Sequence, residues 1–107
     1  MVVQKSPTPP LASGGAIPFN NMHYVYLLKS EKDNKFYIGY SSDLKLRFKQ
    51  HIDGKVKSTK NRRPLKLVYY EAYDSERLAG TRETQLKKFG SAYMALLKRL
   101  DLKKLPD

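Results

Sequence analysis

Residues 24–51 read YVYLLKSEKDNKFYIGYSSDLKLRFKQH, and this stretch decides the fold. Two short segments rich in tyrosine, valine and isoleucine flank a polar turn at 31–35, a pattern typical of an antiparallel β-hairpin. A helical pattern follows, with Arg47 and His51 one turn apart on the same side. We therefore expect a hairpin followed by a helix, with phenols, a guanidinium and an imidazole gathered at one junction.

The remaining pattern predicts an α/β protein of the α+β type, with a small three-stranded antiparallel sheet flanked by helices in the order β-β-α-β-α-α. Strands are expected over 23–29, 35–40 and 65–73. The first helix should follow a cap at 41–43 and end at Gly54, with Leu44, Phe48 and Ile52 facing the core. A second helix should follow a cap at 74–75 and end at Gly90. A third, capped by Ser91, should run to residue 104.

Residues 1–21 differ in composition from the rest of the chain. They hold four prolines, a pair of adjacent glycines and a single charged residue, Lys5. We expect residues 1–21 to form a flexible N-terminal extension and residues 22–107 to form a single domain.

Charge is the strongest compositional signal. The 107 residues include 21 Lys and Arg against 10 Asp and Glu, giving a formal net charge of +11. Such an excess attracts polyanions, so nucleic acid is the first expected partner and an anionic membrane surface the second. There are no cysteines, which excludes disulfides and thiolate metal sites and favours a cytoplasmic setting. No membrane span is expected, because no apolar run approaches about 20 residues.

Several side chains are candidates for chemistry. Tyr24 and Tyr26 share one face of the first strand, and Tyr37 lies on the second; ordinary hairpin packing is the alternative explanation. Arg47 suits a phosphate, or it is a solvated helix charge. Glu83 falls on the core-facing side of its helix, where it needs a divalent ion or a neighbouring arginine as partner. A loop without acids at 55–66 either tracks a phosphate backbone or is merely solvated; its candidate contacts are Lys57, Lys60, Arg62 and Arg63.

These residues resemble the GIY-YIG nuclease superfamily, and in particular its small stand-alone proteins that are similar to the excinuclease C component. Tyr24-Val25-Tyr26 occupies the GIY element, and Tyr37-Ile38-Gly39 matches the YIG element literally. The last tyrosine of the first element and the first of the second are 11 positions apart, as the family pattern asks. Arg47, His51 and Glu83 then follow in the family's order, and the resemblance covers 23 to about 90.

The resemblance implies the GIY-YIG endonuclease fold and a metal-dependent endonuclease that hydrolyses DNA phosphodiester bonds with low sequence specificity. It implies catalytic roles for Tyr26, Tyr37, Arg47 and His51, with Glu83 as ligand of a single Mg²⁺ or Mn²⁺ ion. Tyr26 or Tyr37 would be the general base or its relay, with Tyr26 favoured, and Arg47 and the metal together are expected to lower the pKa of the phenol. Branched, nicked or damaged DNA, a role in repair or recombination, and a targeting protein partner also follow from the resemblance.

One departure from the family pattern leaves an alternative open. Many members carry an asparagine after the glutamate, whereas the helix expected to start at Ser91 contains none. A non-catalytic nucleic-acid-binding module that keeps the fold is therefore the competing hypothesis, and a partner-binding domain is a third. RNA is not distinguished from DNA at this stage.

Overall fold

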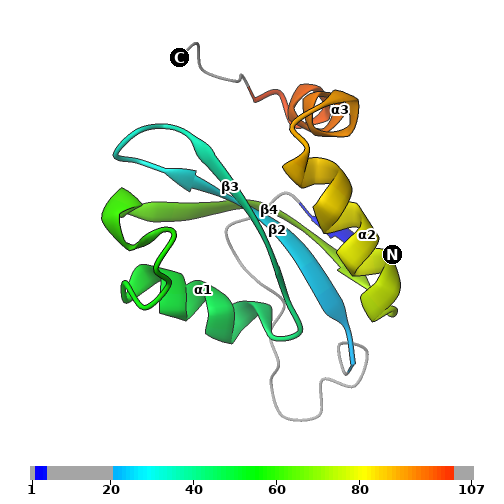
Figure 1. The fold of residues 1–107 in the computed structure, drawn as a ribbon, viewed down its shortest axis with the longest axis horizontal. Coiled ribbons are helices and arrows are strands. Elements are labelled where there is room, and N and C mark those ends of the chain that lie inside the picture. The colour runs from blue at the N-terminus through cyan, green and yellow to red at the C-terminus, as the bar shows by residue number, and fades with distance from the viewer. Residues whose placement is uncertain (1, 5–20, 103–107) are drawn as a thin grey trace.

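A computed structural model describes residues 2–4 and 21–102 (Figure 1). The three expected strands and three expected helices are all present in the expected order. The elements are β1 (Val2–Gln4), β2 (His23–Ser30), β3 (Phe36–Ser41), α1 (Leu44–Ile52), η2 (Lys60–Arg62), β4 (Leu65–Tyr73), α2 (Glu76–Lys87) and α3 (Ser91–Arg99).

The sheet is antiparallel and has the strand order β1-β4-β2-β3. The hairpin partner of β2 is β3, and the long strand β4 pairs along the other edge of β2. Strand β1 was not expected: Val2–Gln4 belongs to the predicted flexible extension, yet it pairs with β4 at residues 70–72. The outer edge of β4 offers unpaired backbone groups, and a short extended segment can satisfy them. Residues 5–20 lie outside the described residues, so the extension there stays a prediction.

Helices cover both faces of the sheet. Helix α1 lies on one side, and α2 and α3 lie on the other (Figure 1). The α1 side holds a core cluster that includes Tyr24, Tyr26, Leu28 and Leu44. The other side holds the larger cluster, which comprises Val25, Leu27, Ile38, Tyr69, Ala79, Leu86, Tyr93, Leu96, Leu97 and Leu100. Alternation along β2 thus sends Tyr24 and Tyr26 toward α1, as the sequence predicts.

A register shift in β4 reverses which residues face which helix. Leu27 pairs with Tyr69 and Leu28 with Leu67, which leaves Val68 without a partner in the ladder. An extra residue of this kind moves the following side chains to the opposite face. Tyr69 consequently faces α2 and α3, whereas Leu67 faces α1.

Three details of the helices correct the sequence-based expectations. Helix α1 does not bury Ile52, which is 49% exposed, because the next side chain inward is His51, which is fully buried. Helix α3 begins at Ser91 and its N-cap is Gly90, so Ser91 is not the cap, and the helix ends at Arg99 instead of running to residue 104. Helix α2 ends at Lys87, ahead of Gly90, while its cap is Ser75 as expected.

Among the residues that the structure describes, no helix is long and apolar enough to span a membrane.

Candidate active site

The glycine of the YIG element leaves room for a tyrosine side chain. Tyr26 and Gly39 are directly opposed on β2 and β3. A methyl group built on Gly39 would overlap the Tyr26 ring and its hydroxyl group. Gly39 therefore lets the Tyr26 ring cross its strand toward α1, so a side chain from the neighbouring strand lies close to the backbone at this glycine.

The hydroxyl group of Tyr26 contacts the imidazole of His51. Its oxygen lies 2.8 Å from Nε2 of His51, and the two rings meet edge-to-face with centroids 5.6 Å apart. The second ring nitrogen, Nδ1, lies 2.7 Å from the hydroxyl oxygen of Thr59. All three residues are buried, so β2, α1 and the loop before η2 are joined by one polar chain.

Thr59 is the site residue that the sequence analysis missed. It is fully buried although it lies in a loop rich in lysine and arginine. No periodic pattern marks it, because its contact is with a residue eight positions earlier on another element. The only sequence signal is an uncharged residue of low polarity within a basic segment.

Burial controls the protonation of the Tyr26–His51 pair. It raises the pKa of Tyr26 to about 12, although the hydrogen bond with Arg47 and the positive charge of Arg47 both lower this pKa. Burial, helped by the charge of Arg47, lowers the pKa of His51 to about 4. At pH 7 both groups are consequently neutral. Arg47 thus acts on the Tyr26 phenol in the expected direction, but desolvation outweighs its contribution to the pKa.

Arg47 and Tyr37 border this pair. Arg47 is half-buried, and its Nη1 donates to Oε1 of Gln50 at 3.1 Å. The Tyr37 ring lies 5.3 Å from the His51 ring and 6.5 Å from the Tyr26 ring, between centroids. The Tyr37 side chain is more exposed than Tyr26, and its hydroxyl accepts a long 3.5 Å hydrogen bond from Ser58. Three aromatic rings and one guanidinium thus share one corner of the molecule.

The other motif residues have packing roles. Tyr24 is buried beside Leu44 and meets Tyr70 edge-to-face at 6.4 Å between ring centroids. Ile38 is buried on the α2 and α3 side of the sheet. Both therefore hold β2 and β3 in place around Tyr26 and Gly39.

Glu83 approaches from α2. It lies in line with Ala79 and Leu86, both buried, as the helical spacing predicts. Its side chain is 23% exposed, and it forms an ion pair with Lys87, at 3.1 Å and one turn further along the helix. The negative charge of Glu83 raises the pKa of both Tyr26 and Tyr40, in each case after the larger effect of burial. Glu83 is thus within electrostatic reach of Tyr26, although it lies on α2 and Tyr26 faces α1.

The surroundings of Glu83 fit a metal held by one carboxylate. Within the described part of the chain, no group of three His, Cys, Asp or Glu side chains could hold an ion. Mg²⁺ is commonly bound by one or two carboxylates together with waters and substrate phosphates. The Lys87 ammonium is half-exposed on a flexible stem, so it can leave Glu83 at little cost. The alternative was that Glu83 pairs with a neighbouring arginine. The neighbouring Arg82 pairs with Glu71 instead.

The cations of the basic loop at 55–66 differ in whether their side chains contact the rest of the protein. Arg62 binds Asp33 at 3.1 Å, and Arg63 donates to the carbonyl groups of Lys60 and Ile52. These two guanidinium groups hold the loop against the hairpin and against the end of α1. Lys57 and Lys60 are exposed, and a phosphate contact by the loop stays a prediction.

Residues 22–94 match the family described as "GIY-YIG catalytic domain". That match spans most of the chain, so the protein belongs to the GIY-YIG family, a superfamily of nucleases that generally depend on a divalent metal and act on DNA. The resemblance inferred from the sequence is thereby confirmed.

The relatives are small stand-alone GIY-YIG proteins named UPF0213. UPF0213 protein YazA of Bacillus subtilis is 45% identical over 69 residues, covering 64% of this chain and 69% of the relative. UPF0213 protein SH2523 of Staphylococcus haemolyticus is 46% identical over 68 residues, covering 63% and 82% respectively. The solution NMR structure of UPF0213 protein BH0048 from Bacillus halodurans is 35% identical and covers 74% of this chain and 84% of that one, with a TM-score of 0.48.

Proposed function

We propose that the protein is a metal-dependent endonuclease that hydrolyses DNA phosphodiester bonds with little sequence specificity. The observation that carries this proposal is the Tyr26 hydroxyl. It lies 2.8 Å from a buried, neutral imidazole, and it experiences the charges of both Arg47 and Glu83. Nucleases need a proton acceptor, a cation for the phosphate and an anchor for a metal, and these four residues supply all three.

Tyr26 acts as a relay in this proposal. As the attacking water gives a proton to the Tyr26 oxygen, the phenolic proton passes to Nε2 of His51. The water's remaining hydroxide forms the new bond to phosphorus, the bond between phosphorus and the 3′-oxygen breaks, and the leaving oxygen takes a proton from a solvent water. The relay requires Tyr26 to donate to Nε2, which places the proton of His51 on Nδ1, where it is donated to the Thr59 hydroxyl oxygen.

Arg47 couples phosphate binding to this relay. Its charge is one cause of the low pKa of His51. A phosphate bound to Arg47 compensates that charge, so His51 becomes a better base when substrate is present. The same guanidinium stabilises the extra negative charge on phosphorus in the transition state. Tyr37, more exposed beside both rings, positions the water or the phosphate.

Glu83 would hold the Mg²⁺ or Mn²⁺ ion, and phosphate oxygens and water would complete its ligands. When bound, the ion supplies charge stabilisation at the phosphate and the leaving oxygen. Lys57 and Lys60 would contact the backbone of the same DNA without reading bases. The proposed enzyme prefers branched, nicked or damaged DNA and acts in repair or recombination.

A non-catalytic nucleic-acid-binding module is the second candidate. Helix α3, at Ser91–Arg99, contains no asparagine, although many family members have one after the glutamate. A tyrosine whose pKa is about 12 is also a weak base by itself. This candidate keeps the DNA contacts and loses the cleavage.

Plasmid nicking separates the two candidates. Supercoiled plasmid and branched DNA are incubated with Mg²⁺, Mn²⁺ or a chelator. We expect metal-dependent cleavage that falls at least about a hundredfold in Tyr26→Phe, Arg47→Ala and Glu83→Gln. Glu83→Gln should still bind DNA, because it removes a negative charge. Matched controls are Arg77→Ala and Glu76→Gln, which are exposed on α2.

Binding without cleavage in every metal condition would reject the enzyme and leave the binding module. Cleavage that survives both Tyr26→Phe and Glu83→Gln would reject the site.

A further inference from the structure

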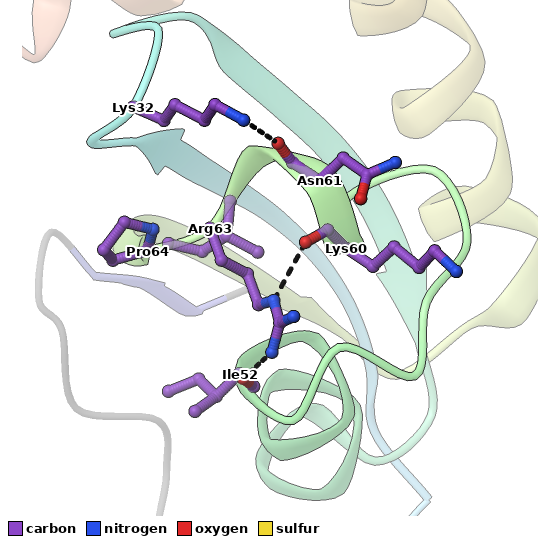
Figure 2. Close-up of a pocket in the computed structure, with 7 residues that line it drawn as sticks. Lys32, Ile52, Lys60, Asn61, Arg63 and Pro64 are labelled. Atoms are coloured by element: carbon purple, nitrogen blue, oxygen red, sulfur yellow. Dashed lines mark hydrogen bonds between the residues drawn. The ribbon is translucent and has the colours of Figure 1, made fainter.

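A hollow of about 540 Å³ lies beside the candidate active site (Figure 2). Its residues come from the β2–β3 turn, the end of α1 and the segment that leads into β4. They are Lys32, Ile52, Lys60, Asn61, Arg63 and Pro64, together with Leu65 at its base. Figure 2 shows Lys32 at one end of the hollow and Ile52 at the other, with Arg63 between them.

Two residues that line the hollow are sequence neighbours of the Tyr26–His51–Thr59 chain. Ile52 directly follows His51 on α1, and Lys60 directly follows Thr59. His51 and Thr59 are fully buried, whereas Ile52 is 49% exposed. Where α1 meets the loop before η2, the Tyr26–His51–Thr59 chain therefore lies on the buried side and the hollow on the exposed side.

Lys32 and Arg63 bring positive charge to the hollow. Nζ of Lys32 donates to the carbonyl of Asn61 at 3.1 Å, and Arg63 donates to the carbonyls of Lys60 and Ile52. These acceptors are neutral, and both cations retain spare N–H groups. The lining contains no carboxylate among the described residues. Of the acids nearby, Asp33 and Asp53 are ion-paired with Arg62 and Lys49 respectively. Glu31 is exposed, and its backbone N–H donates to the Pro64 carbonyl at 2.8 Å.

Gly54 fixes Arg63 in this position. Gly54 has a φ of +75°, and a methyl group there would lie 2.6 Å from the guanidinium carbon of Arg63. The guanidinium therefore lies flat against the backbone at the end of α1. Lys60 also lines the hollow, but its ammonium group points away from Pro64 (Figure 2).

The rest of the lining is apolar. Ile52 and Pro64 are exposed, and Leu65 is buried beneath them. Lys32 and Arg63 suit an anionic group, and the apolar residues beside them suit a flat, weakly polar group. The hollow therefore suits a ligand in which two such groups are joined. The volume falls within the range of sites for small organic ligands, and a nucleotide fits within it.

We propose that this hollow binds one unpaired nucleotide of the DNA, with its phosphate on Lys32 and Arg63 and its base against Ile52 and Pro64. The inference rests on the proposed function, which makes DNA the substrate. Paired bases are stacked inside a duplex and cannot enter a lateral hollow, whereas a base in a single strand can turn outward. The hollow would then favour DNA with a single-stranded segment next to the cleavage site.

Binding in the presence of chelator tests the site without cleavage. Fluorescence anisotropy compares a blunt duplex with a duplex that has a single-stranded overhang and the same number of phosphates. The wild-type protein should bind the overhang DNA about tenfold more tightly, as one added base contact allows. Lys32→Gln and Ile52→Asp should each bring the two affinities to within about twofold. Both side chains are exposed, and Lys32→Gln gives up only a solvent-exposed hydrogen bond to the Asn61 carbonyl, so both variants should fold.

The matched controls lie on the outer surface of α1. Lys45→Gln removes the same charge as Lys32→Gln, and Leu46→Asp adds the same charge as Ile52→Asp. Both should lower the two affinities equally and keep the tenfold preference. Equal wild-type affinities, or a preference that survives in Lys32→Gln and Ile52→Asp, would overturn the proposal. If the wild type cleaves plasmid but does not prefer overhang DNA, the nucleotide site is rejected and the proposed endonuclease activity stands. If it prefers overhang DNA but does not cleave, the activity is rejected and the nucleotide site stands.

Discussion

Gly39 shows how one residue without a side chain sets up the site. Replacement by alanine places a methyl group against the Tyr26 ring, which is wedged between β3 and His51. We expect Gly39→Ala to lower the free energy of unfolding by about 1–3 kcal/mol, as overpacking of a core does. Gly80, inside α2, is the control, because nothing lies within 4 Å of a methyl group there. Gly80→Ala should raise stability by about 1 kcal/mol. Urea denaturation of both variants measures the two opposite signs.

His51 makes stability depend on pH. It is fully buried, and its pKa is about 4 against about 6.5 for an exposed histidine. Between these values the unfolded chain binds a proton that the folded protein does not, so stability is complete above about pH 6.5 and falls as the pH drops toward 4. The difference corresponds to about 3 kcal/mol.

The measurement is urea denaturation at pH 7 and at pH 4.5. His51→Gln removes the titrating group while keeping a polar side chain, so its loss of stability between the two pH values should be smaller than that of the wild type. An identical loss in both proteins would show that His51 is not held neutral by the fold.

At the scale of elements, the strands were predicted best. The third strand was expected at 65–73 and is found at Leu65–Tyr73, because its β-branched and aromatic residues are bounded by Pro64 and Asp74. The face of α1 was predicted less well. The periodic pattern counts apolar residues, so it selected Ile52, whereas the helix buries His51 through contacts with Tyr26 and Thr59. Those partners are far apart in sequence, and no local pattern reports them.

The same limit hid a buried carboxylate between β4 and α2. Glu71 is 1% exposed and accepts hydrogen bonds from Tyr69, Tyr73 and Arg82. Burial alone would raise the pKa of Glu71, but the hydrogen bonds from Arg82 and the two tyrosines hold it below its ordinary value. Only the register shift at Val68 puts these groups on the α2 side. The carboxylate thus fastens α2, and with it Glu83, to the sheet.

Removal of Arg82 tests that attachment. Arg82→Met leaves the Glu71 charge buried without its cation, and we expect a loss of about 3–5 kcal/mol in unfolding free energy at pH 7. The loss should shrink at pH 4, because Glu71 without its cation is protonated more readily. Thermal or urea denaturation gives both values. Arg77→Met, exposed on the same helix, should change stability by less than about 0.5 kcal/mol.

At the scale of the whole molecule, net charge governs the encounter with DNA. The formal charge of +11 predicts affinity that falls steeply with salt, because bound cations release counterions from the DNA. Each phosphate contact contributes roughly −0.9 to the slope of log K against log salt. The double variant Lys57→Gln/Lys60→Gln should therefore make the slope shallower by about 2, with similar effects on DNA of any sequence.

A second double variant separates local contact from overall charge. Lys88→Gln/Lys98→Gln removes the same two charges from exposed positions on the α2–α3 side of the sheet. If Lys57 and Lys60 touch the backbone, this control should lower affinity slightly and keep the wild-type slope, since distant charges are screened beyond about 10 Å at 0.1 M salt. Equal changes of slope in the two double variants would mean that the basic loop attracts DNA only through the field of the molecule, and that no phosphate is bound there.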